Sequence, residues 1–196
     1  MTMCMTRLSV NVNKIATIRN ARGKNNPNVV QMALDIERFG AHGITVHPRP
    51  DERHIRFNDV RELKKNISKE LNVEGYPDQR FLDLIKEVKP AQATLVPDPP
   101  EVLTSNAGWL VEKSKGLLEE VTRTLNLTGA RVSIFIDPYQ ISKAELLWLK
   151  EIGVARIELF TEAFAESFAQ STKASVTKVY RETADLASEV GLAVNA

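Results

Sequence analysis

The sequence has few of the features that mark secreted or membrane proteins. Cys4 is its single cysteine, so no internal disulfide can form, which fits a reducing compartment. Its apolar runs are too short to cross a bilayer, and its start, "MTMCMTRLSV", lacks an apolar stretch of signal-peptide length. We therefore expect a cytoplasmic protein that has no membrane partner.

No charge of either sign predominates. The 196 residues include 26 Lys and Arg against 25 Asp and Glu, a net charge of +1, which gives no reason to expect nucleic acid as a partner. Neither G-x-G-x-x-G nor G-x-x-x-x-G-K-[ST] occurs, so a dinucleotide site or a P-loop is not supported. The length suits a single domain, 1–196, or most of one.

Two kinds of apolar segment alternate along the chain. Helical spacing occurs in 29–39, which places Val29, Ala33, Ile36 and Phe39 on one face and ends at Gly40. Three more such segments end at Pro90, Gly153 and Gly191. Short runs rich in β-branched residues predict strands at 8–12, 43–47, 71–75, 93–97, 131–137, 156–160 and 192–196. Strands that alternate with helices predict an α/β fold with a parallel sheet.

The polar residues at the strand ends favour a closed barrel over an open doubly wound sheet. An open sheet gathers its ligand contacts at one switch point, whereas a (β/α)₈ barrel collects functional groups from the ends of many strands. Nearly every predicted strand here ends in a polar group: Asn11 and Asn13, His47, Glu74, Asp98, Asp137, Glu158 and Asn195. The sequence therefore predicts a TIM-type barrel with its site at the carboxyl ends of the strands.

The stretch "ITVHPRPDERHI", 44–55, is the most informative part of the sequence. A buried strand ends in His47, and Pro48 and Pro50 then end the hydrogen-bonded ladder and stiffen the loop. Rigidity suits Arg49 and His54 if they must be aimed at a ligand in advance, and the planar fork of arginine suits phosphate. On these residues alone, a buried histidine satisfied by a backbone carbonyl, beside a solvated loop, is nearly as good an interpretation.

Two carboxylates are further candidates. Glu74 stands at a strand end before "GYP", which also fits an exposed turn. Glu158 lies mid-strand between Ile157 and Leu159, where an unpaired charge is costly, so we expect a raised pKa or a cationic partner. A structural ion pair is the alternative interpretation of Glu158.

Two loops complete the predicted site. "RNARG" places Arg19 and Arg22 in the loop after the first strand, where phosphate binding is plausible. The long loop "PDPPEVLTSNAGW" after the fourth strand has the composition of a lid that excludes water. A plain surface loop is the alternative interpretation of each.

Together these blocks resemble the pyridoxine 5′-phosphate synthase family. The resemblance rests on "SVNVNKIATIRNARG", "GITVHPRPDERHI", "NVEGYP", "ATLVPDPPEVLTSNAGW", "SIFIDP" and "RIELFTEAFA", in order over almost the whole chain. It implies a (β/α)₈ barrel assembled as an octamer. It also implies a condensation of 3-amino-2-oxopropyl phosphate with 1-deoxy-D-xylulose 5-phosphate to pyridoxine 5′-phosphate, phosphate and water, without metal or organic cofactor.

The resemblance also implies roles for individual residues. His47 and Glu74 match the two proton acceptors, and Glu158 matches a carboxylate that assists the transition state. Arg22 matches the residue that binds the phosphate of the aminoketone. The residues that match contacts to the deoxyxylulose phosphate are Asn11, Arg49, His54 and Thr104.

This chain departs from the family pattern at two places. Asn13-Lys14 stands where many members have Asp-His, so any role of that aspartate as a base does not transfer. The sequence ends at "VGLAVNA", where the family continues into a Gly-His that supplies the proton donor, and then into further helices and an eighth strand. We therefore expect an incomplete barrel of about seven strands that recognises substrate but turns over poorly.

Two other functions stay open from the sequence. The first is another phosphate-handling barrel, such as an aldolase or isomerase. An aldolase of the Schiff-base type would need a lysine at a strand end, and Lys14 is the only candidate. A non-catalytic fragment that binds phosphate or a partner is the second.

Overall fold

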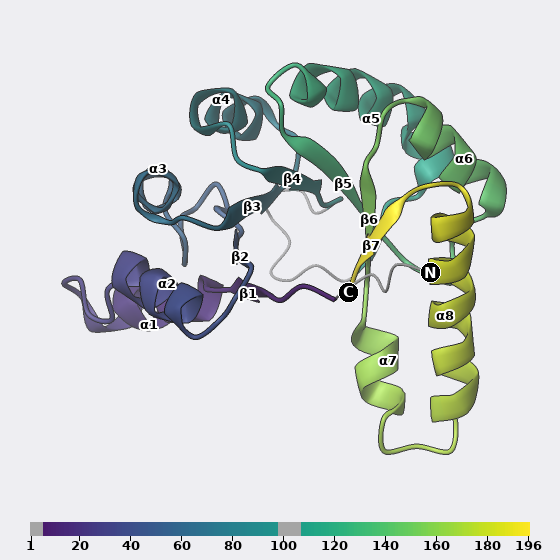
Figure 1. The fold of residues 1–196 in the computed structure, drawn as a ribbon, viewed down its shortest axis with the longest axis horizontal. Coiled ribbons are helices and arrows are strands. Elements are labelled where there is room, and N and C mark those ends of the chain that lie inside the picture. Colours follow the sequence, from purple (N-terminus) through teal and green to yellow (C-terminus); the bar gives the residue numbers. More distant parts are fainter. Residues whose placement is uncertain (1–5, 98–106) are drawn as a thin grey trace. The chain divides into compact units, whose positions relative to one another are not determined.

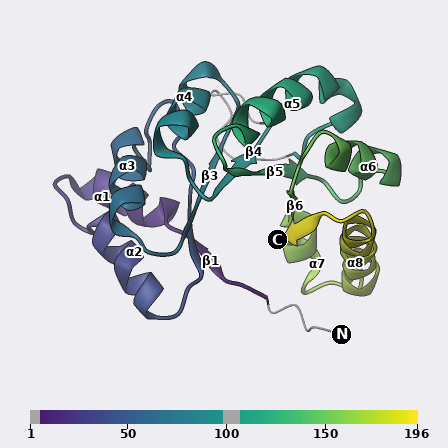
Figure 2. The same ribbon diagram turned by 45° about the horizontal axis from the view of Figure 1, so that its top comes forward.

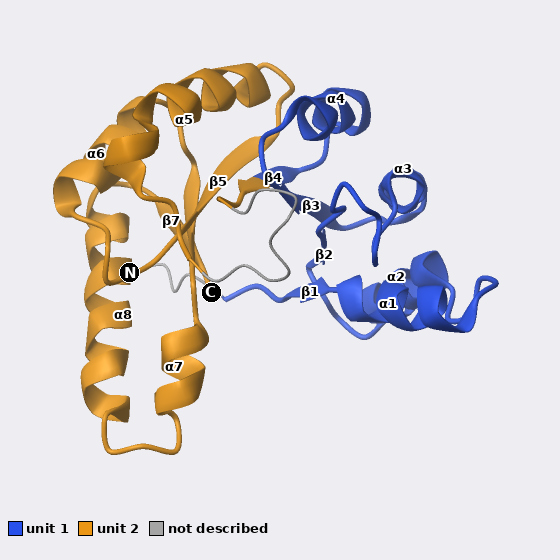
Figure 3. Ribbon diagram, turned by 180° about the vertical axis from the view of Figure 1, so that it is seen from behind, with its two compact units in different colours: residues 1–93 blue, residues 94–196 orange. Residues whose placement is uncertain are grey.

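A computed structural model describes residues 6–97 and 107–196. The chain divides into two compact units, residues 1–93 and 94–196, which Figure 3 distinguishes by colour. Each unit is an alternation of strands and helices. No helix among the described residues is both long and apolar enough to cross a bilayer.

Unit 1 is built from three parallel strands and the helices that follow them (Figure 1). β1 pairs with β2 and β2 pairs with β3, both in parallel. The helices α2, α3 and α4 lie on one side of these strands, as Figures 1 and 2 show. The elements in chain order are β1 (Ser9–Asn11), α1 (Asn13–Arg22), α2 (Val29–Arg38), β2 (Gly43–Val46), α3 (Phe57–Asn66), β3 (Glu70–Gly75) and α4 (Gln79–Val88).

Unit 2 repeats the arrangement after β4 (Gln92–Leu95), the strand within which the sequence boundary between the two units falls. β5 pairs with β6 and β6 with β7, again in parallel. The further elements are α5 (Val111–Asn126), β5 (Arg131–Ile136), α6 (Lys143–Glu151), β6 (Arg156–Leu159), α7 (Glu162–Ser167), α8 (Lys173–Glu189) and β7 (Ala193–Asn195).

The seven described strands confirm the predicted fold class. Strands neighbour one another in chain order within each unit, and every described pairing is parallel. That is the order of a TIM-type (β/α) barrel, here with seven strands among the described residues. Each of the seven predicted strands is present, with ends that lie within two residues of the prediction.

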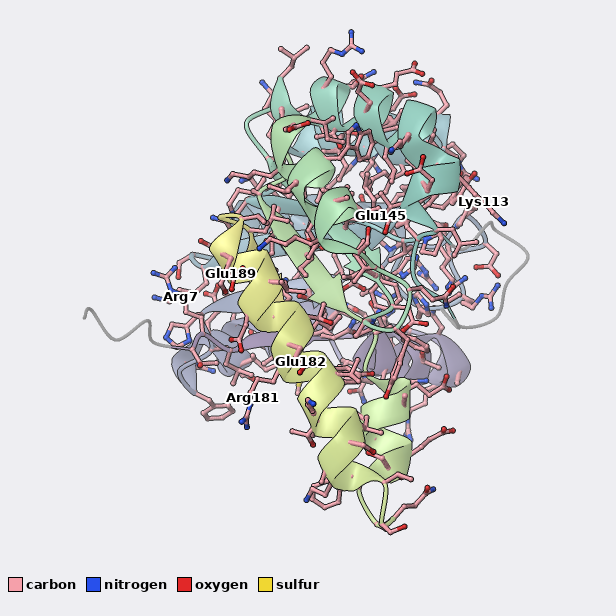
Figure 4. The ribbon with its side chains drawn as sticks, turned by 90° about the vertical axis from the view of Figure 1, so that its right-hand side faces the viewer. Arg7, Lys113, Glu145, Arg181, Glu182 and Glu189 are labelled. Carbon is pink, nitrogen blue, oxygen red and sulfur yellow. The ribbon has the colours of Figure 1, made fainter. Side chains whose placement is uncertain are left out.

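Amphipathic helices cover the strands. In α4, the Asp78 carboxylate accepts a hydrogen bond from the Phe81 backbone N–H and caps the helix. Phe81, Leu84 and Ile85 are buried on its inner face, and each such side chain contributes about 1.5–3 kcal/mol through the area it removes from water. Charged and buried residues separate in the same way on α8, where Figure 4 labels the exposed Arg181, Glu182 and Glu189.

The prediction for 29–39 is right for the helix and wrong for its last residue. Val29 and Ala33 are buried, and Gly40 has the left-handed φ of 104° that favours glycine after a helix end. Phe39, however, is 87% exposed. It is the residue after the last turn, where the helical spacing no longer directs a side chain to the core.

The segment "RNARG" is also different from the prediction. Arg19 and Arg22 lie on a helix, α1, rather than in a loop. This helix has no stripe of large apolar residues, since its buried positions are Ala16 and Arg19. Its sequence therefore lacks the pattern by which a helix is recognised.

Candidate active site

The register of β2 and β3 places His47 beside Glu74. Thr45 is opposite Asn72, and the side chains two positions further on, His47 and Glu74, follow on the same face because side chains alternate along a strand. The His47 Nδ1 lies 3.9 Å from Glu74 Oε2, and both side chains are largely buried, at 10% and 13% exposure. Two proton-transfer groups thus meet at the carboxyl ends of two neighbouring strands.

His47 is held as a neutral imidazole. Burial, followed by the charges of Arg49, His54 and Arg53, lowers the pKa of His47 from 6.5 to about 3. A distance of 3.9 Å is too long for a hydrogen bond between His47 Nδ1 and Glu74 Oε2. The backbone N–H of His47 donates to Asn13 Oδ1 at 2.9 Å, which fixes the residue where the strand ends.

The loop 47–56 carries two more predicted residues. Arg49 is buried, at 5% exposure, and the His54 ring centre is 6.3 Å from that of His47. Burial, then Arg49 and Arg53, lowers the pKa of His54 to about 4. The His54 Nδ1 accepts a hydrogen bond from the Ile55 N–H at 2.9 Å, so in the neutral ring the proton is on Nε2. His54 can therefore donate a hydrogen bond from Nε2 without being charged.

Other residues of this loop pair locally. Arg53 Nε contacts Asp51 Oδ2 at 2.7 Å. Glu52 instead accepts a hydrogen bond from the Phe57 N–H at 2.8 Å.

The candidate residues in β1 and α1 differ in how far they are exposed to solvent. Asn11 is exposed, and its Oδ1 accepts from the Asn13 N–H at 2.9 Å. Arg22 is exposed at the end of α1, where its side chain can meet a ligand. Arg19 is buried at 3% exposure and its Nη1 is 2.6 Å from Asp59 Oδ1, so it is a paired structural cation and not an open phosphate site.

Unit 2 contains Glu158. The register of β6 and β7 places Glu158 opposite Asn195. Burial raises the pKa of the Glu158 carboxyl, against the hydrogen bonds of Asn195 and Thr94 and the charge of Arg156, which lower it. The raised pKa expected from the sequence is therefore present.

Most of the predicted site residues in unit 1 lie together. His47, Arg49, His54 and Glu74 form one cluster, which we call the His47 cluster, at the ends of β2 and β3. Thr104 lies outside the described residues. Asn13 was predicted as a polar residue at a strand end, but its hydrogen bond to the His47 N–H was not. Thr94 was not predicted as a supporting residue, and nothing in the local sequence marks it.

The cluster has the groups needed for proton transfer to and from an anionic ligand. A neutral imidazole can accept a proton, a carboxylate stands 3.9 Å away, and an arginine and a second imidazole can donate hydrogen bonds. No group of three or more His, Cys, Asp or Glu suited to a metal occurs in the described parts of the chain.

A parallel α/β chain with acid–base groups at the carboxyl ends of its strands has the layout of barrel enzymes. The sequence profile of the family described as "Pyridoxal phosphate biosynthesis protein PdxJ" matches residues 8–196. The chain belongs to this family.

Relatives with the name pyridoxine 5′-phosphate synthase align with almost the whole chain. Those of Christiangramia forsetii, Porphyromonas gingivalis and Cytophaga hutchinsonii are 53%, 52% and 50% identical over 192 residues. Each alignment covers 98% of this chain and 79% of the relative, so the chain is shorter than these proteins.

Solved structures with low sequence identity share the fold. A mutant flavocytochrome b2 with pyruvate bound superposes with a TM-score of 0.59 at 12% identity, over 99% of this chain and 53% of that one. A mandelate oxidase mutant with (S)-mandelic acid gives 0.58 at 10% identity, over 87% and 57%. At these identities the likeness concerns the fold alone.

Proposed function

We propose that this chain acts as a pyridoxine 5′-phosphate synthase, condensing 3-amino-2-oxopropyl phosphate with 1-deoxy-D-xylulose 5-phosphate. The observation that carries the proposal is the His47 cluster, within a chain about half identical to synthases over 98% of its length. The reaction forms an imine, eliminates phosphate and closes a ring, so it needs several proton transfers near neutral pH.

His47 is the first proton acceptor in this proposal. Its neutral imidazole has a lone pair available, but a base with a pKa of about 3 is weak. A phosphate bound at Arg49 would offset the cation that lowers the pKa of His47. Substrate binding thus strengthens the base at the moment when it is needed, because the ligand supplies the missing negative charge.

The other residues of the proposed site have the remaining roles in binding and catalysis. Glu74 accepts the second proton. Arg49 and the Nε2–H of His54 hold the phosphate of the deoxyxylulose substrate, together with Asn11 and Thr104. Arg22, exposed at the end of α1, holds the phosphate of the aminoketone, and Glu158 assists the transition state.

Schiff-base catalysis by Lys14, the alternative raised by the sequence, gains no support. Lys14 is exposed, and its charge contributes to the low pKa of His54. Schiff-base lysines are activated in a desolvated pocket or beside another cation.

The test has two parts. Calorimetric titration with 1-deoxy-D-xylulose 5-phosphate measures recognition, and chromatographic detection of pyridoxine 5′-phosphate after mixing both substrates measures turnover. We expect binding in the micromolar to millimolar range typical of enzyme substrates. The second part also tests the expectation that turnover by this chain is low. Absence of both binding and product would contradict the proposal.

A further inference from the structure

Arg19 is a buried charge that the proposed chemistry does not use. It is 3% exposed on α1, whereas its neighbour Ile18 is 52% exposed. Turning a guanidinium inward and an isoleucine outward is costly unless the charge is paired and hydrogen-bonded. The partners of Arg19 therefore indicate what the burial achieves.

Those partners belong to the loop 47–56 and to the start of α3. Arg19 Nη1 contacts Asp59 Oδ1 at 2.6 Å, and Nη2 donates to the His54 carbonyl at 3.1 Å. The other Asp59 oxygen, Oδ2, accepts from the Arg56 N–H at 2.8 Å and so fixes the point where the loop becomes helix. Arg19 thus holds the carboxyl-terminal half of the loop at two points: directly at the His54 carbonyl, and through Asp59 at the Arg56 N–H.

Asn20 fastens the same half through its amide. Its Nδ2 donates to the carbonyls of His54 at 2.9 Å and Arg53 at 3.1 Å, with a longer contact of 3.4 Å to Glu52. Its Oδ1 accepts from Arg19 Nε at 3.1 Å and Nη2 at 3.0 Å. Arg19 and Asn20 therefore hold each other while both hold the loop.

The loop needs such support because it has no regular secondary structure. Glu52 has a φ of 51°, a conformation that is uncommon for a residue with a side chain and persists when its surroundings hold it. The Asn20 amide contacts the carbonyls of Glu52 and of the two residues that follow it, so it supports the loop where this conformation occurs.

We propose that Arg19, Asn20 and Asp59 form a positioning clamp that holds His54 in place for the phosphorylated substrate. The effect on substrate rests on the proposed function, whereas the effect on His54 does not. The clamp residues act through the loop and do not touch the ligand. Because α1 also ends in Arg22, the clamp links the two elements to which we assign the two phosphates.

The experiment compares two arginines of the same unit. Arg19→Met removes the clamp cation and keeps an unbranched side chain. Arg61→Met is the matched control, since Arg61 makes a bidentate contact to Glu87 at 2.7 and 2.8 Å but lies at the surface and contacts α4 rather than the loop. Asn20→Ala is the second clamp variant and leaves the Arg19–Asp59 pair in place.

The first readout is the titration of His54, followed by ¹⁵N NMR in histidine-labelled protein. The charges that act on His54 come from Arg49, Arg53, Asp51 and Lys14, so its pKa reports where the loop lies. In Arg19→Met we expect the pKa of His54 to rise from about 4 toward 6.5 as the ring becomes hydrated. His47 should change less, since β2 and Asn13 hold it.

The second readout is the affinity for 1-deoxy-D-xylulose 5-phosphate by calorimetry. We expect a loss of about tenfold or more in Arg19→Met and Asn20→Ala, and no change in Arg61→Met. If Arg19→Met does not fold, Asn20→Ala decides. A folded clamp variant with an unmoved His54 titration overturns the inference. A shifted His54 in a protein that binds no substrate would uphold the clamp and overturn the proposed function.

Discussion

His47 and Glu74 face each other across β2 and β3 with 3.9 Å between Nδ1 and Oε2, a separation that leaves them close but not hydrogen-bonded. The neutral imidazole of His47 keeps one ring nitrogen whose lone pair can accept a proton. Protonation of His47 would draw the carboxylate toward it, so the pair can share the charge that a proton brings. The electrostatic state of this pair is accessible to direct measurement.

Two of the three histidines should titrate far below the usual range for imidazole. The pKa of His47 is lowered to about 3 and that of His54 to about 4. In ¹⁵N NMR spectra of the free protein between pH 7 and 5, both rings should therefore keep the shifts of neutral tautomers, with the proton of His54 on Nε2. His47→Gln and His54→Gln assign the signals. Titration of either ring near pH 6.5 would contradict the described electrostatics.

The same pKa values predict that acid destabilises the fold. The unfolded chain binds protons at histidine below about pH 6.5, whereas folded His47 binds one only near pH 3. The unfolded state therefore holds more protons in this window, and the free energy of unfolding falls as the pH falls from 6.5 toward 3. Urea unfolding at several pH values measures the slope. His47→Gln should flatten it, and an unchanged slope would argue against a neutral, buried His47.

Glu158 should affect the free energy of unfolding in the opposite direction to His47 as the pH changes, and Glu158→Gln tests this. The raised pKa of Glu158 means that the folded state binds its proton more tightly than the unfolded state, so the carboxyl costs stability as the pH rises through its folded pKa. Glutamine does not titrate. The variant should therefore gain stability relative to the parent protein as the pH rises from 4.5, and then level off. A difference that is flat from pH 4.5 to 8 would contradict the raised pKa.

Two glycines of unit 2 should respond oppositely to alanine. A Cβ at Gly108 would overlap the backbone of Ile136 and Asp137, next to Trp109, whose indole N–H donates to the Leu95 carbonyl at 2.9 Å. Gly108→Ala should cost about 2–3 kcal/mol of unfolding free energy or more.

Gly116 is the matched control, since it lies within α5 with nothing within 4 Å of an added Cβ. Gly116→Ala should stabilise the protein by about 0.5–1 kcal/mol, because alanine is the better helix former. Chemical denaturation measures both values. Equal effects would contradict the close approach of Gly108 to β5.

The strands were predictable because their signals are local. A short run of β-branched residues indicates a strand, and the polar residue that follows it indicates where the strand ends. His47 and Glu74 were therefore correctly placed at strand ends. The raised pKa of Glu158 followed from its apolar neighbours along the strand.

The supporting contacts were not predictable because their partners are distant in sequence. The pairing of Arg19 with Asp59 spans 40 residues and that of Asn13 with His47 spans 34, and neither leaves a periodic pattern. Helix α1 was missed for the related reason that its inner face carries a paired arginine in place of an apolar stripe.

The most direct test of the proposed function is the affinity of Arg49→Ala for 1-deoxy-D-xylulose 5-phosphate, with Arg61→Ala as the surface control. Loss of a charge-assisted contact to phosphate costs about 1.5–3 kcal/mol, so we expect affinity to fall by about tenfold to a hundredfold in Arg49→Ala and to stay unchanged in Arg61→Ala. Substrate should also raise the pKa of His47 in the parent protein and not in Arg49→Ala. Equal affinity of Arg49→Ala and the parent protein would contradict the assignment of the phosphate to the His47 cluster.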